Sequence, residues 1–358
     1  MTPSAHATAM DNESPIRVGF VGLGSYGRLL ARDVRGAADA ELVGIADVDP
    51  ETVAEVGQAL DVSPESQYTD FAELLDGEAL DAVVVATPNG LHHDQITTAL
   101  DRGLAVYCEK PLATTAADAH DLLRRGDAAT ETVMIGYQRH TNPAYDLARD
   151  RWALGDREPT FVTGEITHDW RSYYETMENW RMDPELSGGG HLLNVGTHVI
   201  DAILWTTGLT PTAVTAHVDF HDDEEVFDKQ TAMIVEFEEG AIATISDTGV
   251  VARTREHVHI WDGEGAVYLE GREWGQRTGR VIDSKGTEHD PHHGGGQSTM
   301  AAFVEAIKTG EEPPATVHDG FRATIVTLAA YESGRRGGER VELSELYPEI
   351  DRKLLAPR

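Results

Sequence analysis

Cysteine is almost absent from this 358-residue chain, which contains only Cys108. A single cysteine excludes an internal disulfide and a metal centre built from several thiolates. Cys108 lies inside an apolar run, so we interpret it as a core residue and not as a nucleophile.

Basic residues are also scarce, because 29 Lys and Arg stand against 62 Asp and Glu, a formal net charge of −33. Such a surface repels nucleic acid and anionic membranes, so we expect neither as a partner. The acids are spread along the chain, which is typical of a solvated acidic coat of the halophilic kind. Only five basic residues are lysines, and one of them, Lys110, stands between Glu109 and Pro111 where an apolar run ends.

Long apolar runs are missing as well. No stretch approaches the roughly 18 apolar residues of a membrane-spanning helix. Residues 1–15 are polar and lack a basic-then-apolar signal pattern, so we expect a disordered tail and a cytoplasmic protein.

Residues 16–138 alternate short apolar runs with helical periods. The sequence predicts strands within 16–24, 41–48, 81–89, 104–110 and 132–138, and helices within 25–37, 49–60, 92–103 and 114–129. Asp49 is expected to cap the second helix, with Pro50 at its first position. Continuous apolar strands separated by helices predict an α/β Rossmann domain, a doubly wound parallel sheet covered on both faces.

Residues 139–358 follow a different pattern. Apolar and polar residues alternate within 159–170, 212–221, 230–247 and 255–271, which predicts a large, mostly antiparallel open sheet with hairpin turns at Glu239–Gly240 and Glu264–Gly265. Helices are expected at 194–208 and 298–310. We therefore predict a second, α+β domain, joined at residue 138 without a linker and sharing a cleft with the first.

A glycine motif follows the first predicted strand. Gly22, Gly24 and Gly27 in GLGSYG fit the dinucleotide-binding pattern, and Asp47 stands twenty residues later at the end of the second strand. The motif, with Ser25 and Tyr26 inside it, would place the cofactor pyrophosphate at a helix amino terminus. Asp47 can accept from the ribose hydroxyls and would repel a 2′-phosphate, which favours NAD over NADP.

Polar residues also follow two later strands, at the edge of a parallel sheet where ligands bind. With these motifs, ATPNGLHHDQITTAL, EKPLATT, GYQRHTNPAY and NWRMDPELSGGGHLLNVGTHVID, the chain resembles the Gfo/Idh/MocA oxidoreductases, which include glucose-fructose oxidoreductase and inositol 2-dehydrogenase. The resemblance implies NAD(P)-dependent transfer of hydride between nicotinamide and a hydroxyl of a sugar, sugar derivative or cyclitol. It also implies that residues 139–358 bind the substrate and mediate oligomerisation, as a homodimer or homotetramer.

The resemblance further implies roles for individual residues. Lys110 would hydrogen-bond the reacting hydroxyl, next to a proline often joined by a cis bond, and His198 would take the hydroxyl proton. Asn194, where family members carry Asp or Asn, would position the substrate without relaying a proton. Further cofactor contacts are expected from Thr87, Pro88, Asn89, His92, Glu109, Lys110, Trp180 and Arg181, and the substrate contacts from Lys110, His168, Asn194, His198 and Asp201.

Three further points stay open at this stage. His257 and His259 share a strand face and invite a metal interpretation, with His289, His292 and His293 nearby in sequence, but no carboxylate completes a set and we predict no metal. An NAD-dependent glycoside hydrolase of the same family is an alternative function. A non-catalytic NAD-binding sensor is another, although a sensor has no use for both Lys110 and His198.

Overall fold

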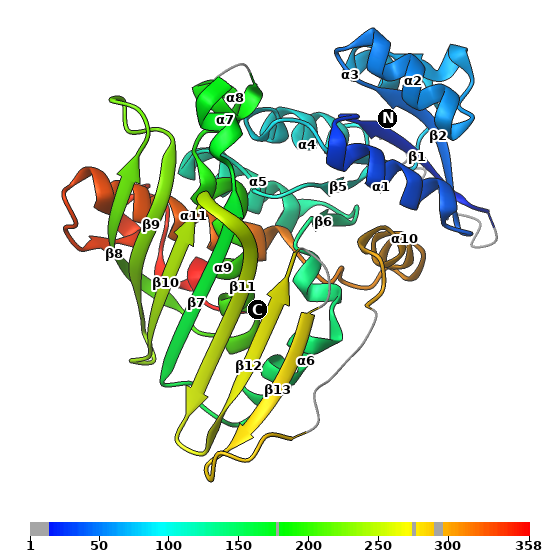
Figure 1. Ribbon diagram of the computed structural model, residues 1–358. Coiled ribbons are helices and arrows are strands. Elements are labelled where there is room, and N and C mark those ends of the chain that lie inside the picture. Colours follow the sequence, from blue (N-terminus) through cyan, green and yellow to red (C-terminus); the bar gives the residue numbers. More distant parts are fainter. Residues whose placement is uncertain (1–13, 177–178, 274–276, 290–295) are drawn as a thin grey trace, which may run out of the picture.

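The computed structural model describes residues 14–176, 179–273, 277–289 and 296–358, and it contains two β-sheets that lie side by side (Figure 1). The polar segment 1–13 and the histidines His292 and His293 lie outside the described residues. Short apolar strands build the first sheet and long alternating strands build the second, as the two sequence patterns predict.

The first sheet has six strands in the order β3-β2-β1-β4-β5-β6, and all its pairs are parallel. Its strands are β1 (Ile16–Val21), β2 (Ala40–Ala46), β3 (Gln67–Tyr68), β4 (Ala82–Val85), β5 (Ala105–Cys108) and β6 (Val133–Ile135). This confirms the predicted doubly wound sheet. Because β1, β4 and β5 are neighbours, the segments that follow them emerge at one edge.

Helices cover both faces of this sheet: α1 (Ser25–Gly36), α2 (Pro50–Leu60), α3 (Phe71–Gly77), α4 (His92–Leu100) and α5 (Ala116–Ala128). The predicted cap is confirmed, since Asp49 accepts from the backbone N–H of Glu51 and Pro50 opens α2. A helix from the other half of the chain, α10 (Thr299–Thr309), also packs here, and Phe303 meets Tyr107 of β5 edge-on at 5.9 Å.

The second sheet has eight strands in the order β13-β12-β11-β7-β10-β9-β8-β14. They are β7 (Phe161–Asp169), β8 (Pro211–Phe220), β9 (Asp228–Phe237), β10 (Ile242–Thr248), β11 (Val250–Asp262), β12 (Gly265–Arg272), β13 (Arg277–Asp283) and β14 (Val341–Glu342). Its pairs are antiparallel except β7 with β10, which confirms a mostly antiparallel sheet.

The two hairpin predictions had different outcomes. Glu239–Gly240 lies in the turn between β9 and β10, where Gly240 takes a positive φ of 86°. The second turn is Gly263–Glu264 and not Glu264–Gly265, because Gly265 already pairs with Asp262. The predicted turn was one residue too late. A glycine stands on each side of Glu264, so residue type alone does not distinguish the two dipeptides.

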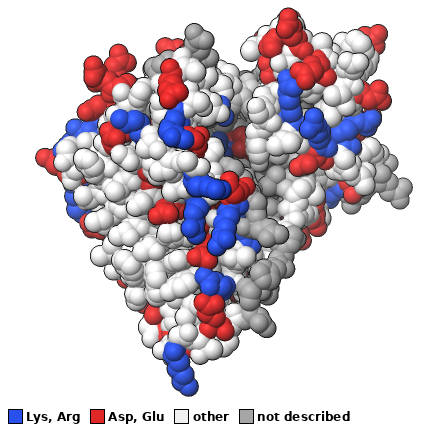
Figure 2. All heavy atoms as spheres, viewed as in Figure 1, with Lys and Arg blue, Asp and Glu red and all other residues white. Residues whose placement is uncertain are grey.

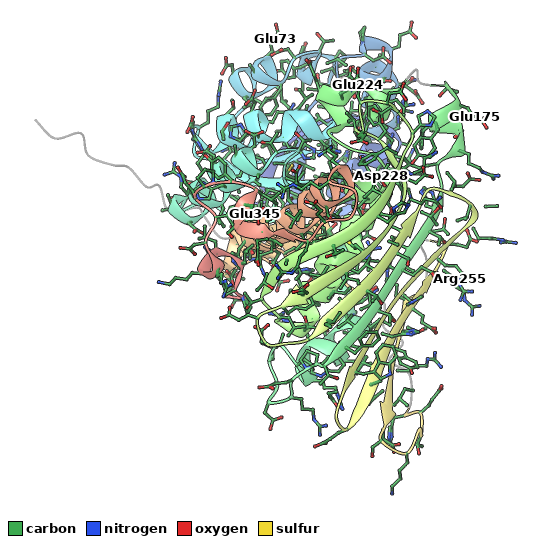
Figure 3. All side chains as sticks on the ribbon, turned by 90° about the vertical axis from the view of Figure 1, so that its left-hand side faces the viewer. Glu73, Glu175, Glu224, Asp228, Arg255 and Glu345 are labelled. Atoms are coloured by element: carbon green, nitrogen blue, oxygen red, sulfur yellow. The ribbon has the colours of Figure 1, made fainter. Side chains whose placement is uncertain are left out.

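Helices α9 (Thr197–Thr207) and α11 (Val317–Arg335) pack against one face of this sheet, and the other face is open (Figures 1 and 3). The open face carries large apolar side chains, among them Phe161, Ile234 and Ile242, each more than two-fifths exposed. Helix α11 was not predicted, because most of its side chains are buried and its sequence has no polar stripe of helical period.

Shorter elements complete the fold. They are α6 (Pro143–Arg151), α7 (Arg171–Thr176), α8 (Pro184–Ser187) and α12 (Arg352–Leu355), the 3₁₀ turns η1 (Pro64–Ser66), η2 (Asn89–Leu91), η3 (Gln138–Thr141), η4 (Trp180–Met182) and η6 (Leu343–Glu345), and one π turn, η5 (Leu192–Gly196). The turns η2 and η5 carry Asn89 and Asn194, two of the residues expected at the site.

Candidate active site

The glycine loop after β1 has the backbone that a pyrophosphate requires. Gly22 has a φ of 91°, and a Cβ there would come 2.4 Å from the carbonyl oxygen of Ala86. A Cβ on Gly27 would meet the carbonyl oxygen of Gly22 at 1.9 Å, so α1 can approach β1 only with glycine there. The space beside Gly24 is open, which leaves room for a ligand at the backbone.

The amino terminus of α1 is left without a side-chain cap. Gly24 occupies the cap position of α1, whereas Asp49, Asp70 and Thr115 cap α2, α3 and α5 with side-chain oxygens. The first N–H groups of α1 are therefore available to an anion, and the helix dipole favours negative charge there. This end of α1 fits the phosphates of a dinucleotide.

Asp47 lies beside this loop at the end of β2. One carboxylate oxygen accepts from the backbone N–H of Leu23 at 2.6 Å and the other from that of Asp49 at 3.0 Å. Both bonds fix the carboxylate at the loop, where a ribose would follow the pyrophosphate. The next residue, Val48, is 87% exposed and offers no positive charge.

The segment after β4 is held by hydrogen bonds of His92 and Asn89, most of them to distant segments. His92 is fully buried, with Nδ1 2.8 Å from the carbonyl oxygen of Pro111 and Nε2 3.1 Å from that of Thr87. Asn89 donates to the carbonyl oxygen of Ser187 and to Oδ1 of Asn194. His92 and Asn89 thus brace the site, which departs from the cofactor contacts expected of them.

Lys110 follows β5 and reaches across to the second half of the chain. Its Nζ donates to the backbone carbonyl oxygen of Asn194 at 2.7 Å, and the Lys110–Pro111 peptide is cis, as the resemblance implies. Burial lowers the pKa of Lys110 to about 8, with Arg181 and Arg139 adding to this and Glu109 opposing it. Glu109, which was expected to contact the cofactor, is buried. Its carboxylate accepts a hydrogen bond from the hydroxyl of Tyr107.

Asn194 and His198 lie on the π turn η5 and the start of α9. The Asn194 amide donates to Ser187 Oγ and to the carbonyl oxygens of Gly189 and Gly190, so its side chain holds the glycine-rich loop. His198 is 3% exposed and meets the Tyr137 ring edge-on at 6.0 Å. Burial, together with Arg139, Lys110 and Arg277, holds the pKa of His198 well below its usual range.

The expected role of Asp201 is not supported. Asp201 is 1% exposed, and its two carboxylate oxygens lie 3.1 and 3.0 Å from Nε2 of His140. The i, i+3 spacing from His198 suggested a shared face, but the carboxylate turns to η3 instead. Asp201 therefore fixes His140 against α9 and is closed to a substrate.

Trp180 and Arg181 lie on η4 at the same side of the site. The Arg181 guanidinium lies 4.5, 5.0 and 5.7 Å from the ring centres of Trp180, Tyr173 and Trp170. His168, near the end of β7, is half-buried close to His191, and burial with that neighbour lowers its pKa to about 4. Arg181 therefore carries a positive charge, and the His168 imidazole is neutral at pH 7.

Two buried clusters were not found from the sequence. One joins Arg139, Glu256 and Arg277. The other joins His191 to Asp247, with Nδ1 at 2.9 Å from both carboxylate oxygens. Glu256, Arg277 and Asp247 each stand at an inward-facing position of a strand. The alternation of apolar and polar residues does not by itself show whether a charged residue there is buried or exposed to solvent.

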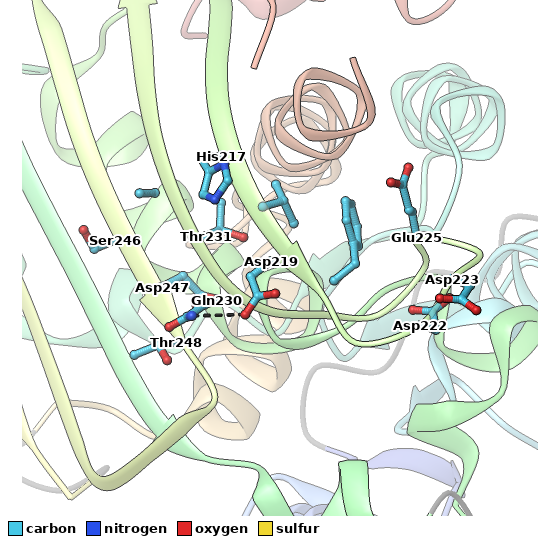
Figure 4. Close-up of a pocket in the computed structure, with 13 residues that line it drawn as sticks. His217, Asp219, Asp222, Asp223, Glu225, Gln230, Thr231, Ser246, Asp247 and Thr248 are labelled. Atoms are coloured by element: carbon cyan, nitrogen blue, oxygen red, sulfur yellow. Dashed lines mark hydrogen bonds between the residues drawn. The ribbon is translucent and has the colours of Figure 1, made fainter. Parts of the chain in front are cut away.

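The open sheet face carries other polar features. His257 and His259 stack at 4.6 Å, and within the described ranges no three potential ligands gather into a metal site. A hollow of about 720 Å³ over β8, β9 and β10 is lined by Asp219, Asp222, Asp223 and Glu225 among others (Figure 4). It contains neither Lys110 nor His198, and its acids would repel a dinucleotide. Among the described helices, none is both long and apolar enough to span a membrane.

Comparison with known proteins decides the family. Residues 16–137 match the oxidoreductase family Gfo/Idh/MocA with an NAD-binding Rossmann fold, and residues 154–268 match the C-terminal domain of the same family. The chain belongs to the Gfo/Idh/MocA family of oxidoreductases.

Relatives in this family support the assignment. A D-xylose 1-dehydrogenase [NADP(+)] of Haloarcula marismortui is 30% identical over 268 residues, 74% of each chain. A myo-inositol 2-dehydrogenase of Thermotoga maritima is 23% identical and covers 89% of this chain and 96% of its own. A solved levoglucosan dehydrogenase, in complex with NADH and L-sorbose, shares the fold with a TM-score of 0.79 at 21% identity, covering 92% of this chain and 99% of its own.

The family confirms what the sequence predicted about class. This Gfo/Idh/MocA protein is an NAD(P)-dependent oxidoreductase with a Rossmann sheet and a large, mostly antiparallel second sheet. Figure 2, in the view of Figure 1, shows a hollow between the part built on the first sheet and the part built on the second.

Proposed function

We propose that this Gfo/Idh/MocA protein is an NAD-dependent dehydrogenase that oxidises one hydroxyl of a sugar, sugar derivative or cyclitol. The observation that carries the proposal is the contact between Lys110 Nζ and the backbone of Asn194, four residues before His198. It brings an ammonium and a neutral imidazole to the edge of the sheet where the glycine loop also lies.

The two side chains would divide the chemistry of the hydroxyl. The Lys110 ammonium donates a hydrogen bond to the reacting oxygen, and the neutral His198 takes its proton as the carbonyl forms. The nicotinamide of the bound cofactor would accept the hydride from the same carbon. His198 then passes the proton to solvent, so that one C–H and one O–H bond are broken and one C=O bond is formed.

The preference for NAD rests on Asp47. A carboxylate fixed by two backbone N–H groups favours two ribose hydroxyls and opposes a 2′-phosphate, and Val48 supplies no compensating charge. The Haloarcula marismortui relative is an NADP(+) enzyme, so the preference is tested directly and not transferred from relatives.

The remaining proposals concern substrate and assembly. The relatives are named for D-xylose and myo-inositol, which supports a neutral polyol as substrate. The open face of the second sheet, with Phe161, Ile234 and Ile242 exposed, supports a homodimer or homotetramer. We also propose a cytoplasmic location.

The test is an NADH absorbance assay of the purified full chain against a panel of pentoses, hexoses and inositols. We expect NAD-dependent oxidation of at least one of them, and its loss in His198→Ala. Cofactor that copurifies without net NADH production, together with release of a sugar from a glycoside, would contradict the dehydrogenase and indicate the hydrolase.

A further inference from the structure

The amino terminus of the π turn η5 is held by two side chains from distant elements. His191 occupies its cap position, but the His191 ring binds a carboxylate of β10. Leu192 donates its backbone N–H to Oδ2 of Asp228 on β9 at 2.9 Å. Leu193 donates its backbone N–H to the hydroxyl oxygen of Tyr331 on α11 at 3.1 Å. The first N–H groups of a helical turn have no partner within the turn, so these two side chains supply the acceptors.

Asp228 and Tyr331 are also bound to each other. The Tyr331 hydroxyl donates to Oδ1 of Asp228 at 2.5 Å, and both residues are buried. Tyr174 of α7 donates its hydroxyl to the backbone carbonyl oxygen of Asp228 at 2.8 Å, which fixes the start of β9. The Tyr331 hydroxyl is thus a donor to the carboxylate and an acceptor for the turn at the same time. We call Asp228 and Tyr331 the η5 clamp.

Two glycines before the turn leave room for the η5 clamp. A Cβ on Gly190 would lie 2.3 Å from the backbone carbonyl oxygen of Asp228 and 2.7 Å from its Oδ1. A Cβ on Gly189 would lie 2.7 Å from the hydroxyl oxygen of Tyr331. Contacts this short exclude any larger residue at the two positions, so the glycine run is required where the η5 clamp meets the turn.

A continuous set of hydrogen bonds joins the η5 clamp to Lys110. Asn194 is the next residue of the turn, and its side-chain amide donates to the carbonyl oxygens of Gly189 at 3.1 Å and Gly190 at 2.8 Å. Its backbone carbonyl oxygen accepts from Lys110 Nζ at 2.7 Å. The acceptor of the ammonium therefore lies one residue after the N–H group that Tyr331 holds.

We propose that the η5 clamp is a positioning element for the reaction, which fixes the Asn194 carbonyl oxygen and thereby directs the Lys110 ammonium to the reacting hydroxyl. Asp228 and Tyr331 act through Asn194, and they take no part in moving the proton. A small displacement of a catalytic donor lowers the rate even when the donor itself is retained. The inference rests on the proposed function, because it assigns the η5 clamp a role through Lys110.

The chain has only five lysines, which permits a readout of Lys110 that needs no turnover. The full-length protein is labelled with ¹³C at lysine Cε, and the Lys110 NMR signal is assigned by its loss in Lys110→Arg. A fixed carbonyl acceptor stabilises the charged ammonium, so its displacement lowers the pKa of Lys110, which is about 8. Tyr331→Phe should lower the titration midpoint by about 0.5 pH units or more. Glu109, Arg181 and Arg139, the charged groups that act on Lys110, are unchanged in this variant.

Tyr145→Phe is the matched control, because it removes a hydroxyl from an equally buried tyrosine. Tyr145 and Tyr331 are each 1% exposed, and the Tyr145 hydroxyl donates to Glu256 of β11 at 2.5 Å. A buried donor to a carboxylate is thus lost outside the η5 clamp, and the midpoint of Lys110 should stay in place. An unchanged midpoint in Tyr331→Phe, or an equal fall in both variants, would overturn the proposal.

Asp228→Asn separates the hydrogen bonds of the η5 clamp from its charge. The amide oxygen can still accept from Leu192, and the Tyr331 hydroxyl can still accept from Leu193. The midpoint of Lys110 should therefore fall less in Asp228→Asn than in Tyr331→Phe. A larger fall in Asp228→Asn would show that the charge of Asp228 acts on the ammonium, and it would overturn the proposal.

Kinetics with an oxidised polyol test the same path. Tyr331→Phe should lower kcat by about tenfold or more and leave the Kd of NAD unchanged. In a Lys110→Ala background the same change should alter kcat by less than about twofold, because the contact through which it acts is already lost. Fully additive effects would overturn the path through Lys110. If no polyol is oxidised but the midpoint of Lys110 falls as expected, the η5 clamp is supported and the proposed function alone fails.

Discussion

Lys110 Nζ lies 2.7 Å from the backbone carbonyl oxygen of Asn194, and this hydrogen bond joins the edge of the parallel sheet to the π turn that precedes His198. Lys110 and Asn194 are 84 residues apart in the sequence, and His198 follows Asn194 by four residues. Their relative position thus depends on how the two sheets pack.

The first prediction concerns this pair. Lys110→Ala and His198→Ala should each lower kcat by about 10²- to 10⁴-fold, the usual contribution of a positioned proton donor or acceptor. Binding of NAD, measured by calorimetry, should change little, because the glycine loop and Asp47 are separate from both side chains.

Lysine chemistry is tested by a charge-conserving change. Lys110→Arg should be nearly as inactive as the alanine variant, because a guanidinium needs a planar partner and cannot replace a compact ammonium. Lys308→Arg is the matched control, since Lys308 pairs with Asp39 at the surface. Activity in Lys110→Arg equal to that of the control would contradict the assigned role.

The rate of oxidation should decrease at alkaline pH. Burial lowers the pKa of Lys110 to about 8, so the ammonium that donates to the substrate oxygen is present below this pH and is lost above it. kcat/KM should therefore decline as the pH rises through about 8. An increase through the same range would mean that the free amine of Lys110, and not His198, takes the proton.

Cofactor preference should respond to Asp47. Asp47→Ser together with Val48→Arg should raise the ratio of kcat/KM for NADP over NAD by about tenfold or more, because a repulsive carboxylate is replaced by a guanidinium that binds phosphate. Val48→Arg alone is the control, with a smaller expected gain because Asp47 remains. An unchanged ratio in the double variant would exclude a ribose contact by Asp47.

A buried carboxyl should make stability depend on pH. Asp228, at the start of β9 (Figure 3), accepts from the hydroxyl of Tyr331 on α11 and from the backbone of Leu192, and burial with the nearby Asp247 raises its pKa to about 7. Its folded pKa is above the unfolded value of about 3.9, so its contribution to the free energy of unfolding is present at low pH and is lost as the pH rises from about 4 to 7.

Thermal melts across this range test the carboxyl. Asp228→Asn, which cannot ionise, should flatten the decline of Tm between these pH values, whereas Asp223→Asn, the same change of charge in an exposed turn, should keep the wild-type slope. Equal slopes in the two variants would show that Asp228 ionises alike in the folded and unfolded chain.

The acidic surface should make stability depend on salt. With a net charge of −33, the folded chain repels itself, and raising KCl from about 0.1 to 1 M shortens the screening length from about 10 to 3 Å. Tm should rise with KCl and rise equally with tetramethylammonium chloride. A rise that only KCl produces would indicate specific ion binding instead of screening.

Much of the architecture could be predicted because it is written in local patterns. The strand runs, the Asp49 cap and the glycine loop each depend on neighbours within a few residues. Helix α11 could not be predicted, since a helix buried on most sides has no amphipathic period. The turn at Gly263–Glu264 was misplaced because two adjacent dipeptides were equally suitable.

The site was predictable to a smaller extent. Sequence and family resemblance selected Lys110, His198 and Asp47, and the structure brings the first two to one edge. The same reasoning placed Asp201 and His92 in contact with ligands, but their polar atoms are occupied by His140 and by backbone carbonyls. Whether a polar side chain faces a ligand or another buried group depends on partners far away in sequence.

The sequence by itself determined the fold class, the dinucleotide loop and the place of Lys110, one of only five lysines, after a buried strand, because these follow from residue type and spacing. The tertiary structure alone decided which charges surround His198. Arg139 is 117 residues from Glu256 along the chain, and it meets Glu256 and Arg277 only when η3, β11 and β13 pack together. Electrostatic interactions act through space, so the protonation of the base is a property of the folded protein.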